Sequence, residues 1–89
     1  MMVSAKLQTD WSLLSKLLRL AQRDGWDISF AEDRVSVAHR RARGGLVVLP
    51  VALLGHAREE GWRVARQPAG FELRHPSVRQ RVEVSLASA

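Results

Sequence analysis

The chain contains no cysteine, so it can form neither a disulfide nor a thiolate metal site, and it has no cysteine nucleophile. It also lacks a long apolar run: the longest, Leu46–Leu54, covers nine residues and includes Pro50, whereas a membrane span takes roughly 18 to 20 residues. Lys6, Lys16 and Arg19 interrupt the amino-terminal segment, which therefore lacks the apolar core of a secretory signal. We expect a cytoplasmic protein without membrane association, and no motif in the chain indicates a cofactor.

What is present is an ordinary globular composition of 46% apolar and 26% charged residues. This composition argues against disorder, collagen and coiled-coil rods. With 89 residues the chain has room for one domain, 1–89, which must be held together by packing alone near the lower size limit for independent folding.

Positive charge is concentrated in the later part of the sequence. Residues 1–33 carry four basic and five acidic residues, a balance of −1, whereas residues 34–89 carry ten arginines and four glutamates, a balance of +6. Arginine pairs with phosphate and carboxylate through a planar fork of donors and stacks on bases, which favours a polyanionic partner. A genome that uses arginine in place of lysine throughout would give the same composition without any such function.

The sequence repeats itself at an offset of 36 residues. Aligning 17–28 with 53–64 superposes two leucines, an alanine and a Gly-Trp pair, and the same shift places His39 on His75. A Gly-Trp pair at two helix-to-strand junctions, in a chain with three tryptophans, indicates an internal duplication. We expect repeats at about 9–49 and 50–89.

Each repeat is predicted to be a helix followed by three strands. Apolar side chains, Trp11 among them, follow the helical period up to about Asp24, with Thr9 or Asp10 as the N-cap and Gly25 ending the helix. The second helix begins with Pro50 in its first position and ends before Gly61. Alternating patterns then predict strands at 26–30, 35–38 and 46–49 in the first repeat, and at 62–64, 71–73 and 81–86 in the second. The fold class is α+β, a tandem αβββ-αβββ arrangement with two helices packed on one face of antiparallel strands, in one sheet or two.

Alternation along these strands also predicts a basic sheet face. If the apolar side chains face the helices, four arginines of the second repeat point the other way, and three arginines that follow the second strand extend the patch. These candidate nucleic-acid-binding residues are Arg63, Arg74, Arg79, Arg81, Arg40, Arg41 and Arg43. Glu72 and Glu83 share the parity of the arginines, so cross-strand Arg–Glu pairs are the structural alternative.

Catalytic and metal sites have little support in the sequence. His39 and His75 stand at equivalent repeat positions, but neither has a carboxylate or second histidine at ligand spacing, and His56 sits within the second helix. Gly44-Gly45 lacks the lysine and the helix of a phosphate-binding loop, so we interpret it as a turn. We expect no metal site.

The second repeat resembles the HicA toxins of bacterial toxin–antitoxin pairs. The resemblance rests on Glu59-Glu60-Gly61-Trp62, Arg66-Gln67, Arg74-His75-Pro76 and Arg81-Val82-Glu83-Val84. The first repeat resembles the family in a more diverged form, through Arg23-Asp24-Gly25-Trp26 and residues 35–39. The segment 12–60 also follows the family's helix-strand-strand-strand-helix order. The resemblance implies a fold like the double-stranded RNA-binding domain and cleavage of messenger RNA by a histidine that follows Gly-Ser.

The family's catalytic motif is missing here. Where it has Gly-Ser-His, this chain has Ala69-Gly70-Phe71 in the second repeat and Asp33-Arg34-Val35 in the first, so no catalytic residue is carried over. Our first hypothesis is a non-catalytic, HicA-like domain that binds nucleic acid, with RNA favoured. The alternative is a small inhibitor or toxin–antitoxin partner that binds a protein, and open strand edges leave a homodimer as a further candidate. A ribonuclease using His39 or His75 is the remaining enzymatic interpretation.

Overall fold

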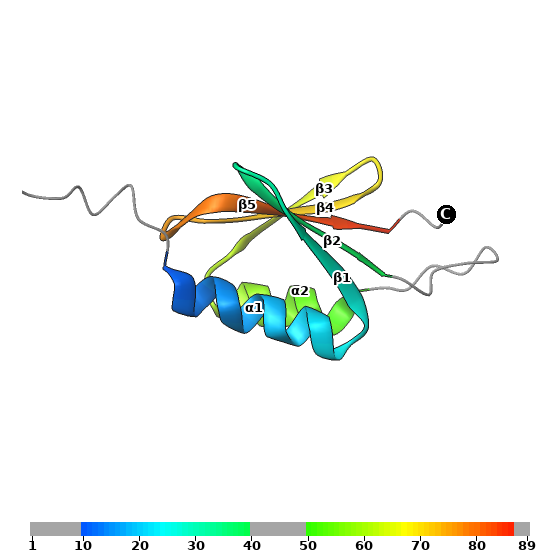
Figure 1. Cartoon of the computed structure of the whole chain (residues 1–89), viewed down its shortest axis with the longest axis horizontal. Coiled ribbons are helices and arrows are strands. Elements are labelled where there is room, and N and C mark those ends of the chain that lie inside the picture. Colours follow the sequence, from blue (N-terminus) through cyan, green and yellow to red (C-terminus); the bar gives the residue numbers. More distant parts are fainter. Residues whose placement is uncertain (1–9, 40–49, 87–89) are drawn as a thin grey trace, which may run out of the picture.

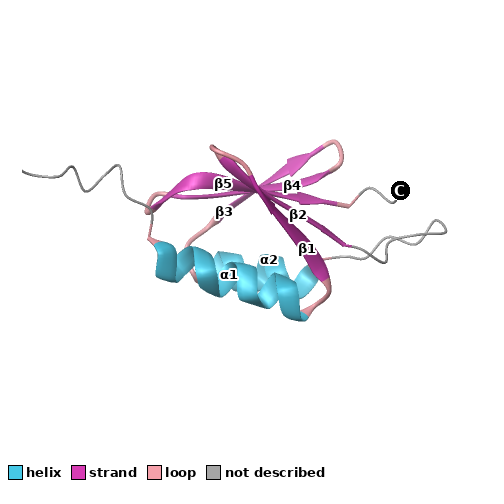
Figure 2. Ribbon diagram, in the orientation of Figure 1, coloured by secondary structure: helices cyan, strands magenta, loops and turns pink. Residues whose placement is uncertain are grey.

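The computed structural model describes residues 10–39 and 50–86 of the chain. Two helices cover one face of a five-stranded sheet, whose other face is left open by them (Figures 1 and 2). The elements are α1 (Trp11–Arg23), β1 (Trp26–Phe30), β2 (Arg34–His39), α2 (Val51–Glu59), β3 (Arg63–Gln67), β4 (Gly70–His75) and β5 (Val78–Ser85). The predicted α+β class is confirmed, and the described strands form one sheet. The strand predicted at 46–49 and the turn at Gly44-Gly45 lie outside the described residues.

Helix α1 begins and ends where its capping residues predict. The Asp10 carboxylate accepts a hydrogen bond from the Leu13 N–H at 3.1 Å, and Gly25 follows the helix with a φ of 90°. The prediction that Trp11 belongs to the apolar face was wrong, since its side chain is 59% exposed. At 100° per residue, Trp11 lies about 90° around the helix axis from the centre of the buried stripe. Its side chain is therefore at the edge of the apolar face, next to solvent.

Helix α2 is shorter and has a weaker start. Pro50 stands at its N-cap rather than in the predicted first helical position, and no side chain caps the helix. Leu53, Leu54 and Ala57 are buried against the sheet, and Gly61 follows the helix with a φ of 93°. None of the helices among the described residues has both the length and the apolar character needed to cross a bilayer.

The strand order is β1-β2-β5-β4-β3, so β5 lies at the centre between two hairpins. The prediction of a purely antiparallel arrangement was wrong, because β2 and β5 run parallel with Val35 opposite Val82. The β1–β2 hairpin pairs with a strand of the second half, and the long connection through α2, β3 and β4 lets it do so in the parallel direction.

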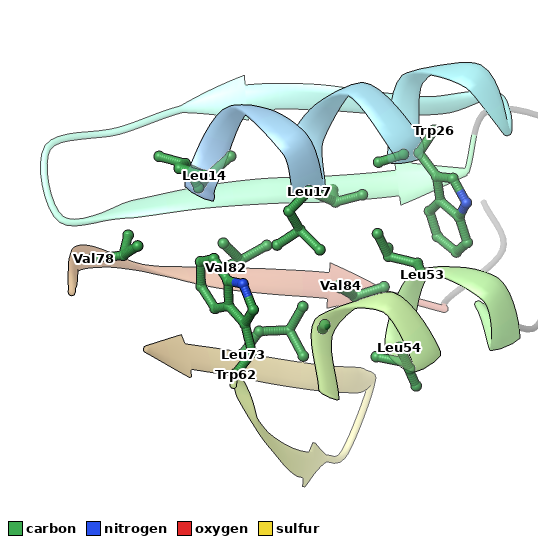
Figure 3. Close-up of a cluster of buried hydrophobic side chains, with 14 residues drawn as sticks. Leu14, Leu17, Trp26, Leu53, Leu54, Trp62, Leu73, Val78, Val82 and Val84 are labelled. Carbon is green, nitrogen blue, oxygen red and sulfur yellow. The ribbon is translucent and has the colours of Figure 1, made fainter. Parts of the chain in front are cut away.

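Residues 36 positions apart occupy matching places in the two hairpins. Ile28 lies opposite Val37 as Val64 lies opposite Leu73, and the other three registered pairs from Asp27 to Phe30 shift in the same way. Trp26 and Trp62 each have 4% of their surface exposed. Figure 3 shows these two indoles apart from each other in the buried cluster, among leucines and valines from both helices and from the sheet.

Candidate nucleic-acid interface

Four adjacent strands each place one arginine on the outer face of the sheet, the face turned away from the helices. Arg63 of β3 lies opposite Arg74 of β4, and Arg81 of β5 lies beside Arg34 of β2. Side chains alternate along a strand, and the neighbours of these arginines, such as Leu73, Val82 and Val35, are buried on the helix side. We call Arg63, Arg74, Arg81 and Arg34 the arginine row.

A pair of glutamates lies directly beside the row. Glu72 of β4 is opposite Glu83 of β5, a juxtaposition of like charges that destabilises a sheet when nothing compensates it. Arg81 compensates it, because its Nε lies 3.0 Å from a Glu83 carboxylate oxygen and 3.6 Å from one of Glu72. Arg74 donates to Glu72 at 3.1 Å, and Arg34 lies 3.8 Å from Glu83. The Arg–Glu pairing that the sequence left open as an alternative is therefore present.

Arg81 is the most enclosed member of the row, and it holds the carboxylates together. Its side chain is 25% exposed, and its guanidinium also approaches Asp33 at 3.5 Å. The hydrogen bond to Glu83 and the negative charges around it raise the pKa of Arg81 above its usual value. Arg81 therefore stays positively charged at every physiological pH, and its charge is already matched by carboxylates.

Three arginines instead line a hollow of about 280 Å³ between the start of β3 and the hairpin formed by β4 and β5. Arg63 and Arg74 enter it from the row, and Arg79 enters it from β5. No Asp or Glu is among the residues described around this hollow. The positive charge that remains available for a ligand thus lies at the β3 end of the row.

The structure brings together four of the seven arginines predicted to bind nucleic acid, Arg63, Arg74, Arg79 and Arg81. The other three, Arg40, Arg41 and Arg43, lie outside the described residues. Sequence analysis missed Arg34, which joins the row only because β2 pairs with β5. Arg34 and Ser36 are two residues apart on β2 and so point to the same, outer face of the sheet. No local sequence pattern predicts that β2 pairs with β5.

The two equivalent histidines have structural contacts. His39 Nε2 lies 3.0 Å from the carbonyl oxygen of Asp24, and its ring meets Trp26 edge-on with centroids 5.0 Å apart. His75 repeats the arrangement, with Nε2 at 2.9 Å from the Glu60 carbonyl and its ring 5.4 Å from Trp62. Each imidazole therefore ties the end of a helix to the end of a hairpin.

A larger hollow of about 640 Å³ lies beside the junction of α1 and β1, around Gly25, Trp26 and His39. Its charged lining is mixed, with Arg23 next to Asp24 and Asp27. Within 10–39 and 50–86, no three His, Asp or Glu side chains gather closely enough to hold a metal ion. Charge of one sign distinguishes the smaller hollow at β3, which we take as the better candidate site.

No family model matches this chain, and neither the curated proteins nor the solved structures contain a significant match to it.

Proposed function

We propose that the protein binds nucleic acid, with RNA favoured, through the outer face of its sheet and without catalysis. The observation that carries the proposal is the arginine row, in which β3, β4, β5 and β2 each contribute one guanidinium to the face that the helices leave open. Neighbouring strands are about 4.8 Å apart, so the row spans about 14 Å and can contact several phosphates at once.

The shape of this face favours RNA over the major groove of DNA. Both helices pack their apolar sides against the inner face of the sheet, so the open surface with the arginine row is a sheet and not a helix. A sheet suits the wide, shallow minor groove of A-form RNA or a single strand. The outward positions described on β2 to β5 are occupied by arginine, glutamate and small or amide side chains, so no aromatic ring there can stack on a base. We therefore expect phosphate contacts and little sequence preference.

The glutamates limit the strength of the interaction. Glu72, Glu83 and Asp33 neutralise much of the charge of Arg81, and Glu72 and Glu83 also pair with Arg74 and Arg34. A phosphate can therefore contact Arg63 without such competition, whereas at Arg74 and Arg34 it competes with a carboxylate. Three contacts to a single strand correspond to a slope of about −2 in a plot of log affinity against log salt. Binding should therefore be weak and strongly dependent on salt.

We also propose that the two halves arose by tandem duplication and that the second is a diverged relative of the HicA toxins. The matching hairpin registers, the glycines with positive φ at 25 and 61, and the matching Trp–His contacts support the duplication. The contact of His75 with the Glu60 carbonyl supports a structural role for the histidine of Arg-His-Pro. A non-catalytic function is consistent with both observations.

A filter-binding titration with a short RNA hairpin tests the proposed function. We expect Arg34→Gln/Arg63→Gln to bind about tenfold more weakly and to flatten the salt slope by about 1.5, since each substitution removes one phosphate contact. The matched control is Arg58→Gln/Arg66→Gln, which removes the same charge from exposed positions of α2 and from the helix-side parity of β3. Equal weakening of both variants, or wild-type binding that does not respond to salt, would contradict the proposal.

A protein partner is the second candidate function, because three large apolar residues of the described chain, Trp11, Phe30 and Val51, remain exposed. Phe30 at the end of β1 is 67% exposed, and Trp11 is 59% exposed. A pull-down repeated after nuclease treatment separates the two candidates. A protein retained by the wild type after nuclease treatment but lost with Phe30→Ser favours protein recognition, whereas loss of all retained material with nuclease favours RNA.

A further inference from the structure

The hollow at the β3 end of the arginine row has the features of a site for a compact anion. It lies where the register between β4 and β5 shifts, between Leu73 and His75, so that Arg79 and Arg74 both face the start of β3. The residues around it are Arg63, Arg74, His75, Pro76, Val78, Arg79 and Gln80. Its volume of about 280 Å³ exceeds that of a single phosphate group and leaves room for the sugar attached to it.

The three arginines around this hollow differ in their contacts with the rest of the protein. Arg63 and Arg74 are directly opposite each other across β3 and β4, an arrangement that costs stability when no anion lies between them. Arg63 has no ion pair with any residue in the described part of the chain. Arg74 uses its Nε for Glu72, and a guanidinium has four further N–H donors on its two terminal nitrogens. Arg79 makes contacts of its own and adds a third positive charge to the same wall.

We infer that this hollow binds the terminal phosphate of a nucleic-acid strand, an inference that rests on the proposed function. A phosphate inside a strand is a diester with a single negative charge, whereas a terminal phosphomonoester carries about −1.5 to −2 at neutral pH. Three guanidinium groups around one hollow favour the phosphate with the greater negative charge. Hydrogen bonds from a guanidinium to a phosphate oxygen become stronger as the charge of the phosphate increases. Pro76 provides an apolar surface beside the arginines against which the terminal nucleotide can lie.

Three single-stranded RNA oligonucleotides of the same sequence test this inference. One carries a 5′-phosphate, one a 3′-phosphate, and one has hydroxyls at both ends. We expect one of the phosphorylated strands to bind the wild type about tenfold more tightly than the hydroxyl-ended strand, the size of gain expected from one charge-assisted bidentate contact. The strand that gains identifies which end of the nucleic acid the hollow accepts.

Two variants locate the effect in the hollow. Arg63→Gln should abolish the preference for the phosphorylated end, whereas Arg66→Gln, on the same strand but with the opposite parity, should keep it. Circular dichroism of both variants checks that each is folded.

The failures of this inference and of the proposed function can be told apart. If all three oligonucleotides bind equally, or if Arg66→Gln removes the preference as fully as Arg63→Gln, the terminal-phosphate inference is wrong and the proposed function stands. If none of them binds and the RNA hairpin does not bind either, the proposed function itself is wrong.

Discussion

At the scale of single residues, His75 shows how the second helix is joined to its hairpin. The Ser77 N–H donates to Nδ1 of His75 at 3.0 Å, so the neutral ring carries its proton on Nε2 and donates it to the carbonyl of Glu60. That carbonyl belongs to the last turn of a helix, where no helical N–H remains to satisfy it. Glycine is favoured at position 61 because its φ is 93°, and a Cβ there would also lie 3.1 Å from Nε2, so that the ring would have to shift by a few tenths of an ångström.

Replacing His75 with phenylalanine tests this role. The Phe ring keeps the edge-on contact with Trp62 but loses both hydrogen bonds, so we expect the free energy of unfolding to fall by about 1–2 kcal/mol. Urea denaturation gives the value, and His39→Phe, which loses the matching bond to the Asp24 carbonyl, should fall into a similar range. An unchanged urea midpoint for His75→Phe would show that the two bonds contribute nothing.

The sequence predicted part of this cluster and not the rest. The Gly-Trp pairs and the equivalence of His39 and His75 are visible at the offset of 36. The contact between each histidine and a helix carbonyl spans 15 residues and forms only when the hairpin closes against the helix, so no local pattern contains it. The pairing of Arg81 with Glu72 and Glu83 was foreseen as an alternative, whereas the contact with Asp33, in the turn before β2, depends on the pairing of β2 with β5 and has no local signal.

At the scale of elements, α2 is the weaker helix. It has nine residues, no side-chain cap, and Gly55 within its middle turns, where α1 has Arg19 at the equivalent position. Helix boundaries were predicted well because Asp10, Gly25 and Gly61 are local signals, whereas the pairing of β2 with β5 depends on contacts between distant segments. Trp11 was placed wrongly because a residue on the rim of the apolar stripe satisfies the same periodicity as a buried one.

Gly55→Ala should stabilise the protein. A Cβ at this position would meet no atom within 4 Å, so the substitution removes the conformational cost of a mid-helix glycine without a clash. We expect a gain of about 0.5–1 kcal/mol in the free energy of unfolding, measured as a higher urea midpoint. Gly61→Ala is the contrasting variant, since its φ of 93° and the nearby His75 ring make an added Cβ unfavourable. A lower midpoint for Gly55→Ala would contradict this account of α2.

At the scale of the whole molecule, β5 makes one unit out of two hairpins. It pairs with β2 on one side and β4 on the other, and Val82 and Val84 of β5 are buried in the core that both helices share. In the described sheet, each hairpin pairs with the rest of the molecule through β5 alone. The two halves should therefore unfold together although their hairpins match.

Fluorotryptophan labelling measures this coupling without changing the sequence. The ¹⁹F resonances of Trp26 and Trp62, both buried, should lose their native intensity at the same urea concentration, because loss of β5 exposes both ends of the core. The resonance of Trp11, 59% exposed, should shift little and serves as the internal control. Two separate midpoints for the buried pair would show that the hairpins fold independently.

The central place of β5 also sets the order of events during translation. Four strands leave the exit tunnel before the strand that joins them, so the nascent polypeptide first holds two hairpins whose inner edges have no neighbour. Such edges are templates for pairing with other chains. Chaperone demand and premature proteolysis should thus be greatest just before Val78–Ser85 emerges, and a stalled product that ends near Pro76 should aggregate rather than persist as a smaller folded protein.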